Sequence, residues 1–230
     1  MFKTGLAFLI FLLLLGFTPA QATVVTINAS QFTNGLNNQT INDIVWTSSP
    51  GNFQKKTIDG WTGVGISGGT AGEIDINEIL TGTILPGLTF RVPSFTLGFL
   101  FDGPEFGDVQ EVAQVTITRL GGGITTYTLT LNYSAMPSWT GMGSVSQLSP
   151  PVSGSAAVWR VDDPFGSLYD ITGIQFTALA GTCGTGPCTN QSDYSLVQLK
   201  YEAVPEPGTY AMLGLGLIGL GLLARRRQAS

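Results

Sequence analysis

The sequence predicts an all-β protein, an antiparallel β-sandwich of jelly-roll type, with an immunoglobulin-like sandwich as the alternative. Apolar and polar residues alternate with a period of two in many short stretches. Glycine, proline and asparagine separate these stretches, and no amphipathic helix interrupts them. Short strands without crossover helices pair in antiparallel order, so these observations favour a sandwich.

The alternation predicts strands at residues 24–28, 73–79, 88–92, 95–101, 115–119, 127–133, 156–161, 171–178 and 194–201. The clearest signal is a β-hairpin, because Gly121-Gly122-Gly123 separates two alternating stretches and glycine adopts positive φ readily. The stretch from Met136 to Gly154 is rich in serine, proline and glycine. We expect it to be a long surface loop that binds or connects.

The N-terminus has the pattern of a secretory signal peptide. One basic residue, Lys3, precedes an apolar stretch from Leu6 to Phe17, and Pro19 and Ala20-Gln21-Ala22 follow. A small-residue site of this kind is where a signal peptidase cleaves. We therefore expect residues 1–22 to be removed and the mature chain to begin at Thr23, with an uncleaved N-terminal anchor as the alternative.

The C-terminus, residues 204–230, has three parts that do not suit a soluble core. Val204, Pro205, Glu206, Pro207 and Gly208 form a short proline motif, and no charged residue occurs from Pro207 to Ala224. An apolar helix over about residues 209–224 is near the lower length limit for crossing a membrane. Arg225, Arg226 and Arg227 follow it, and basic residues remain on the cytoplasmic side.

This combination resembles the PEP-CTERM sorting signal of Gram-negative bacteria. The resemblance rests on Val204, Pro205, Glu206 and Pro207, on the glycine- and leucine-rich helix, and on the three arginines. It implies recognition by an exosortase, a membrane-embedded transpeptidase that removes such tails, often in bacteria that make exopolysaccharide. It concerns about 27 residues and implies nothing about the activity of the rest.

The predicted exported body, residues 23–203, is acidic and contains no histidine. Six basic residues stand against fourteen acidic residues up to Glu202, which gives a formal net charge of −8. Nucleic acid is therefore excluded as a partner, because its phosphates require clustered basic residues. The absence of histidine excludes Ser-His-Asp and Cys-His catalysis and histidine-ligated metals. Cys183 and Cys188, separated by Gly-Thr-Gly-Pro, are expected to form a disulfide after export.

Four carboxylates recur at steps of three in Asp102, Glu105, Asp108 and Glu111. Calcium accepts six to eight oxygen ligands in flexible geometry, so a folded acidic loop at the edge of a sandwich would suit it. The spacing does not match an EF-hand, and an acidic solvated loop between two strands is the alternative. Calcium is the only cofactor that the sequence indicates.

A second acidic segment, Glu73 to Glu78, alternates differently. If it is a strand, Glu73, Asp75 and Asn77 share one face, which we expect to be solvated, while Ile74 and Ile76 share the other. The alternative is a pair of carboxylates for glycoside hydrolysis, which requires two acids about 5–9.5 Å apart.

Tryptophan offers flat apolar rings that stack on sugars, although most tryptophans in sandwiches belong to the core. Trp46, Trp61 and Trp159 are expected in or at the edge of the core. Trp139 is the candidate for glycan stacking, because it lies in the Met136 to Gly154 loop.

Three classes of function remain. The first is a non-enzymatic surface or matrix protein, exported, held at the inner membrane by its helix until an exosortase processes it, and then displayed on the cell surface or secreted. The second is a carbohydrate-binding module for exopolysaccharide with a structural calcium. The third, a glycan-active enzyme, has the least support, and we expect no catalytic activity.

Overall fold

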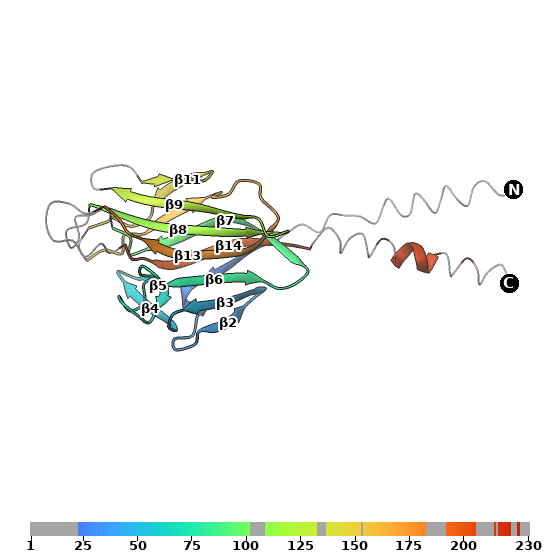
Figure 1. Cartoon of the computed structure of the whole chain (residues 1–230), viewed down its shortest axis with the longest axis horizontal. Helices are drawn as coiled ribbons and strands as arrows, with labels where there is room; N and C mark the ends of the chain where they lie inside the picture. The colour runs from blue at the N-terminus through green and yellow to red at the C-terminus, as the bar shows by residue number, and fades with distance from the viewer. Residues whose placement is uncertain are drawn as a thin grey trace.

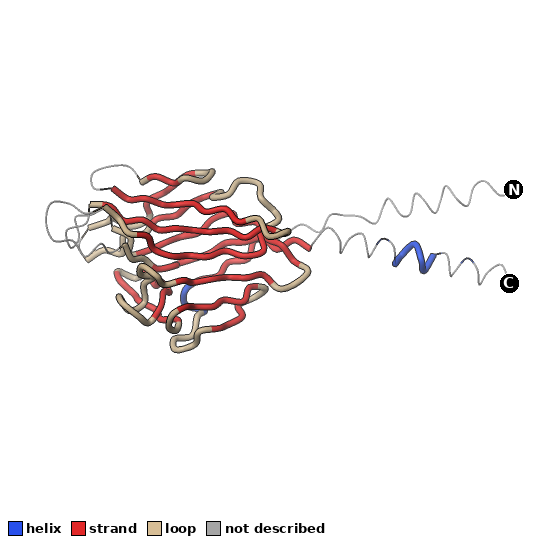
Figure 2. Tube along the Cα trace, in the orientation of Figure 1, coloured by secondary structure: helices blue, strands red, loops and turns tan. Residues whose placement is uncertain are grey.

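A computed structural model describes residues 23–101, 109–132, 137–152, 154–182 and 192–205. In the C-terminal segment it also describes residues 214, 216–221 and 225. Within the described part of residues 23–205, strands joined by loops dominate, and the one helical element is a short 3-10 helix, η1 (Ala29–Gln31) (Figure 2). The predicted all-β class is therefore confirmed.

Fourteen strands are described, and all pairings between them are antiparallel. In chain order they are β1 (Val24–Asn28), β2 (Asn38–Ile41), β3 (Ile44–Ser49), β4 (Phe53–Ile58), β5 (Trp61–Ile66), β6 (Ile79–Ile84), β7 (Leu88–Gly98), β8 (Gln110–Arg119), β9 (Ile124–Asn132), β10 (Ser138–Trp139), β11 (Ser144–Gln147), β12 (Trp159–Asp162), β13 (Ile171–Leu179) and β14 (Ser195–Pro205).

The strands form one continuous, curled sheet. One part has the order β2-β3-β6-β13-β8-β9-β10, and Figure 1 shows β9, β8, β13, β6, β3 and β2 in succession from top to bottom. The other part has the order β11-β12-β7-β14, after which β1 and β5 pair with different stretches of β14 and β4 follows β5. The pairing of Ile171 with Phe90 joins β13 to β7 and so connects the two parts.

The core lies between the two parts of the sheet. Phe176 of β13 meets Phe95 of β7 edge to face, with 5.9 Å between ring centroids. Near β2 and β3, the ring of Phe32 contacts those of Trp46 and Phe53. Successive strand residues point to opposite faces. In β6, β8, β9 and β13 the inward positions are mostly apolar and the outward positions mostly polar.

Several predicted elements are confirmed. β1 has the predicted bounds, and the glycine hairpin is β8 and β9. The stretches 88–92 and 95–101 form the single strand β7, which runs through Pro93 to Gly98. β12, β13 and β14 overlap the last three predicted strands.

Two predictions about the chain are wrong. Residues 73–79 form no strand before Ile79, because Gly72 and Asn77 adopt positive φ and only isolated bridges form at Glu73, Ile74 and Ile76. The stretch 136–154 is not irregular throughout, since it contains β10 and β11. The sequence patterns also missed β2 to β5 and most of β6.

The predicted signal peptide, residues 1–22, lies outside the described residues. Of the predicted helix at 209–224, only residues 214 and 216–221 are described, and they are helical. Among the parts of the chain that the structure describes, no helix combines the length and the apolar character that crossing a membrane requires.

Candidate functional site

The beginning of β1 and the end of β14 lie side by side. Val24 pairs with Glu202, so the predicted mature N-terminus lies beside the point where the chain leaves the body. β14 continues through Val204 and Pro205, which pair with Thr89 and Leu88 of β7. We call this end of the sheet the exit end (Figure 1).

An ion-pair network holds the exit end together. Arg91 of β7 donates to Asp163 at 2.8 Å and lies 3.5 Å from Glu202 of β14. Its guanidinium also lies over the ring of Tyr169, 5.7 Å from the centroid. The hydrogen bond with Asp163 raises the pKa of Arg91 above its ordinary value. The network links β7 to β14 just before the predicted motif.

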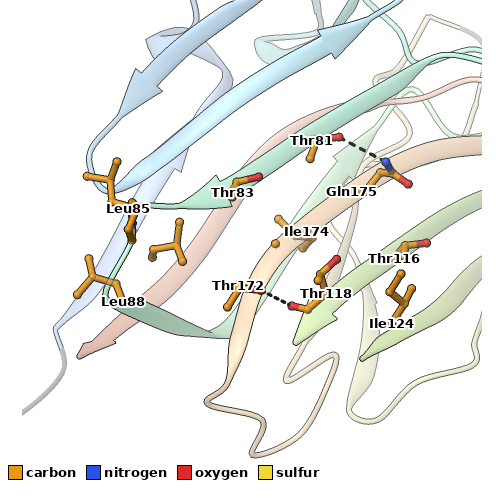
Figure 3. A pocket seen from close by; sticks show the side chains of 13 residues that line it. Thr81, Thr83, Leu85, Leu88, Thr116, Thr118, Ile124, Thr172, Ile174 and Gln175 are labelled. Atoms are coloured by element: carbon orange, nitrogen blue, oxygen red, sulfur yellow. Dashed lines mark hydrogen bonds between the residues drawn. The ribbon is translucent and has the colours of Figure 1, made fainter. Parts of the chain in front are cut away.

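A groove of about 380 Å³ opens on the outer face beside the exit end (Figure 3). We call it the threonine groove. Its lining comes from β6, the β6–β7 turn, the start of β7, β8, β9 and β13. The lining residues are Thr81, Thr83, Ile84, Leu85, Pro86, Leu88, Thr116, Thr118, Ile124, Thr172, Gly173, Ile174 and Gln175. The lining thus combines hydroxyl and amide groups with aliphatic side chains, and it contains no charged residue.

At the other end of β14 lies the acidic cluster, which consists of Glu73, Asp75, Glu78 and Asp193. The segment that holds Glu73, Asp75 and Glu78 forms isolated bridges with β5, with β13 and with the residue before β14: Glu73 pairs with Ile66, Ile76 with Ala178 and Ile74 with Tyr194. Lys56 contacts the Glu73 carboxylate at 2.7 Å. The cluster is therefore built into the packing of the sheet.

Hydrogen bonds to the Ser67–Thr70 turn fix the other carboxylates. The backbone N–H of Thr70 donates to Asp75 at 2.6 Å, and its hydroxyl donates to Asp193 at 3.3 Å. A Cβ added to Gly69 would lie 2.6 Å from the Asp75 carboxylate, and one added to Gly68 would overlap that of Glu78. Glycine at both positions thus allows the turn to approach the acids.

Burial changes the ionisation of this cluster. Glu73 is only 2% exposed, and burial together with Asp193 raises its pKa to about 7, although Lys56 opposes the shift. Burial also raises the pKa of Glu78. The prediction that Glu73 lies on a solvated face is therefore wrong, because the segment is a turn that directs the carboxylate inward rather than a strand.

The predicted calcium ligands are mostly outside the described residues. Asp102, Glu105 and Asp108 are not described, whereas Glu111 is a buried residue of β8 that accepts the Phe101 N–H at 2.6 Å. Within the described residues, no group of three or more acids or cysteines is arranged to hold a metal ion. Calcium binding stays a prediction. The predicted disulfide partners, Cys183 and Cys188, also lie outside the described residues.

The candidate stacking residue, Trp139, is half-buried in β10. Its indole N–H donates to the Pro164 carbonyl at 3.1 Å, and its ring stacks on Tyr127 with 5.6 Å between centroids. Phe95 contacts it edge to face. These contacts explain its position by packing, and its role in glycan stacking stays a prediction.

The other tryptophans follow the expectation for core residues. Trp46 and Trp159 are buried, and Trp61 packs at the edge of a smaller cluster with Phe99.

Sequence reasoning missed both the threonine groove and the burial of Glu73. Alternating threonines in β6 and β8 were visible, but they indicated only an outer sheet face. The groove depends on three strands that are distant in the sequence, and the only local signal was a glycine, Gly173, inside an otherwise alternating strand.

Comparison with known protein families matches one segment of the chain. Residues 203–227 match the family model of the PEP-CTERM protein-sorting motif. The matched segment begins at Ala203, inside β14, and includes the proline motif and the three arginines. No curated protein and no solved structure matches the chain.

Proposed function

We propose, from the premise that this chain carries a PEP-CTERM sorting motif, that it is an exported surface or matrix protein with no enzymatic activity. An exosortase removes its C-terminal tail, and the β body then acts by contact at the cell surface or in the secreted matrix. We further infer that the curled sheet is a jelly-roll-like sandwich, in keeping with the antiparallel pairing of its described strands.

The observation that carries this proposal is the continuity between the body and the motif. β14 pairs with β7 as far as Pro205, so the motif follows the fold with no intervening linker. β1 begins beside the same point. A signal peptide before Thr23 and a tail after Pro205 would therefore hold the body by one end during export, and the rest of its surface would remain available.

Two observations support a non-enzymatic role. The chain has no histidine, which removes the commonest general base. In the acidic cluster, Glu73 is buried against Lys56 and Asp75 accepts a backbone N–H, so both carboxylates already have partners inside the fold. A glycan-active enzyme would require a pair of acids facing a sugar site.

Carbohydrate binding is a second candidate function, and the threonine groove is the observation that favours it. A binding module would use the same export and sorting route, so the two proposals are compatible. Structural calcium remains part of this second candidate as the sequence predicts it, with Asp102, Glu105, Asp108 and Glu111 as its proposed ligands.

The proposed sorting is tested by replacing Pro205, Glu206 and Pro207 with alanine in the producing bacterium. We expect the wild-type protein in the surface or secreted fraction and the variant in the inner-membrane fraction, detected by an antibody against the body. The matched control replaces Pro150 and Pro151, two prolines of a surface loop outside the motif, and should behave as wild type. Surface delivery of the motif variant at the wild-type level would overturn the proposal.

A further inference from the structure

We propose that the threonine groove binds a segment of a neutral polysaccharide. The inference deepens the proposed contact role by naming a site and a class of ligand. Polysaccharide binding is measured on purified protein, so a failure of binding is distinguished from a failure of sorting.

The groove exists because Gly173 has no side chain. In the sheet register Gly173 lies between Thr83 of β6 and Thr118 of β8, so a row of outward residues is interrupted at its centre. The register shift between Ile171 and Gly173 carries β13 towards β7, where Ile171 pairs with Phe90. Leu85 of the β6–β7 turn and Leu88 at the start of β7 also line the groove (Figure 3).

The polar groups of the groove point outward and are partly held in place. Gln175 donates to the Thr81 hydroxyl at 3.4 Å, and Thr172 donates to the Thr118 carbonyl at 3.3 Å. Within the described residues, the hydroxyls of Thr83 and Thr118 have no hydrogen-bond partner. Each is both a donor and an acceptor and can bond a sugar hydroxyl in either sense.

The aliphatic residues of the groove match the apolar faces of a sugar ring. A pyranose has hydroxyls around its edge and C–H groups on its faces, so a fitting site needs a few polar groups beside aliphatic surface. Leu85, Leu88 and Ile124 supply that surface, and the exposed fraction of Ile124 is 69%. The groove also adjoins the exit end, since Leu88 pairs with Pro205.

The uncharged lining of the groove and the negative charge of the body favour a neutral polysaccharide. No acidic or basic side chain lines the groove. The nearby Arg119 is held by three hydrogen bonds to Asp170, which leaves its charge compensated. The net charge of the body, −8 from six basic and fourteen acidic residues, further disfavours polymers of uronic acids by repulsion.

The test is binding of the exported, purified protein to a panel of immobilised polymers at low ionic strength. The neutral members are dextran, a soluble β-glucan, a galactan and a mannan, and the acidic members are alginate and polygalacturonate. We expect saturable binding to at least one neutral polymer and none to the acidic ones. If the protein binds none of the neutral polymers, or binds only the acidic ones, the proposal is refuted.

Two variants locate the binding. A Cβ at Gly173 would lie 3.6 Å from the nearest atom, so the backbone accepts a side chain there, and Gly173→Leu should fill the groove and weaken binding by about 10-fold or more. Thr83→Val removes one hydroxyl at constant shape and should weaken it by roughly 2- to 10-fold. Thr83→Val also keeps the test valid if Gly173→Leu fails to fold.

The matched control is Thr47→Val. Thr47 is an exposed residue of β3, whose register partner on β6 is Thr81, and it does not line the groove. Its variant should bind as wild type does. If Thr47→Val weakens binding as much as Thr83→Val, or if both groove variants bind normally, the groove is not the site.

Discussion

At the scale of single residues, Glu73 combines burial with an ionisable group. Its carboxylate is 2% exposed and paired with Lys56, yet burial and Asp193 raise its pKa to about 7 from 4.5. One opposing cation is therefore insufficient to compensate for the lost hydration. Between pH 4.5 and about 7, the folded protein therefore keeps a proton on Glu73 that the unfolded chain has already lost.

This proton makes stability depend on pH. Between pH 4.5 and 7 the folded state binds more protons than the unfolded state, so stability falls as pH rises through this range. We expect the free energy of unfolding to be about 2 kcal/mol lower at pH 8 than at pH 5.5 on account of Glu73. Urea denaturation at the two pH values measures it.

Glu73→Gln should remove most of this difference, leaving the smaller contribution of Glu78 in the same direction. Lys56→Ala should increase the difference, because it removes the cation that lowers the pKa of Glu73. Lys55→Ala is the control, since the described residues include no ion pair of Lys55. A pH dependence unchanged by Glu73→Gln would show that this carboxylate ionises normally.

Trp139 provides a second test at this scale. Because its ring packs against Tyr127, Phe95 and Phe165, we expect Trp139→Ala to destabilise the protein by about 3 kcal/mol. Chemical denaturation measures the change. A loss of glycan binding with unchanged stability would instead assign Trp139 to a binding surface. Met142→Ala, at an exposed position nearby, should change stability little.

At the scale of secondary-structure elements, β14 belongs both to the body and to the sorting motif. Val204 and Pro205 pair with Thr89 and Leu88, and the Thr89 hydroxyl donates to the Val204 carbonyl at 3.4 Å. A strand held in a sheet cannot enter the active site of a peptidase unless it first leaves its partner. The proposed processing would therefore be restricted to bonds beyond the paired residues.

We expect the mature protein to end at Pro205 or later. Mass spectrometry of the C-terminal peptide from the exported protein identifies its last residue. A mature chain that ends before Pro205 would show that the last residue pairs of β14 with β7 separate before cleavage. The Pro150 and Pro151 variant serves as a control, because it leaves β14 unchanged and should yield the same C-terminus.

Sequence patterns predicted the strands in which every inward position carries an apolar side chain. β8 and β9 are the clearest case, because Val115, Ile117 and Leu129 alternate with outward threonines. β5 was missed because Gly63 and Gly65 interrupt its pattern. A Cβ at Gly63 would overlap Ser195, and one at Gly65 would overlap the Glu73 backbone, so close packing between strands dictates glycine there.

The site was only partly predictable, because it depends on local turns and on the register of distant strands. Residues 73–79 alternate as a strand does, but Gly72 and Asn77 take positive φ and convert the segment into a turn that buries Glu73. The threonine groove depends on the register of Thr83, Gly173 and Thr118, which are brought together only by the fold. The sorting motif was predictable because its sequence alone is what the family model matches.

At the scale of the whole molecule, the two ends of β14 carry different features. β14 is eleven residues long, which corresponds to about 35 Å between its ends. Val24, Pro205 and the threonine groove lie at one end, whereas the acidic cluster adjoins Tyr194 at the other. A tail at the exit end would keep the groove close to the membrane and the acidic cluster far from it until processing.

The most direct test of this account is the intact mass of the exported protein in cells with and without exosortase activity. With the exosortase, we predict a chain that starts at Thr23 and lacks Arg225, Arg226 and Arg227. Without it, or with Pro205, Glu206 and Pro207 replaced by alanine, the chain should retain all three arginines and remain in the membrane fraction. A surface protein that keeps these arginines in cells with an active exosortase would contradict the account.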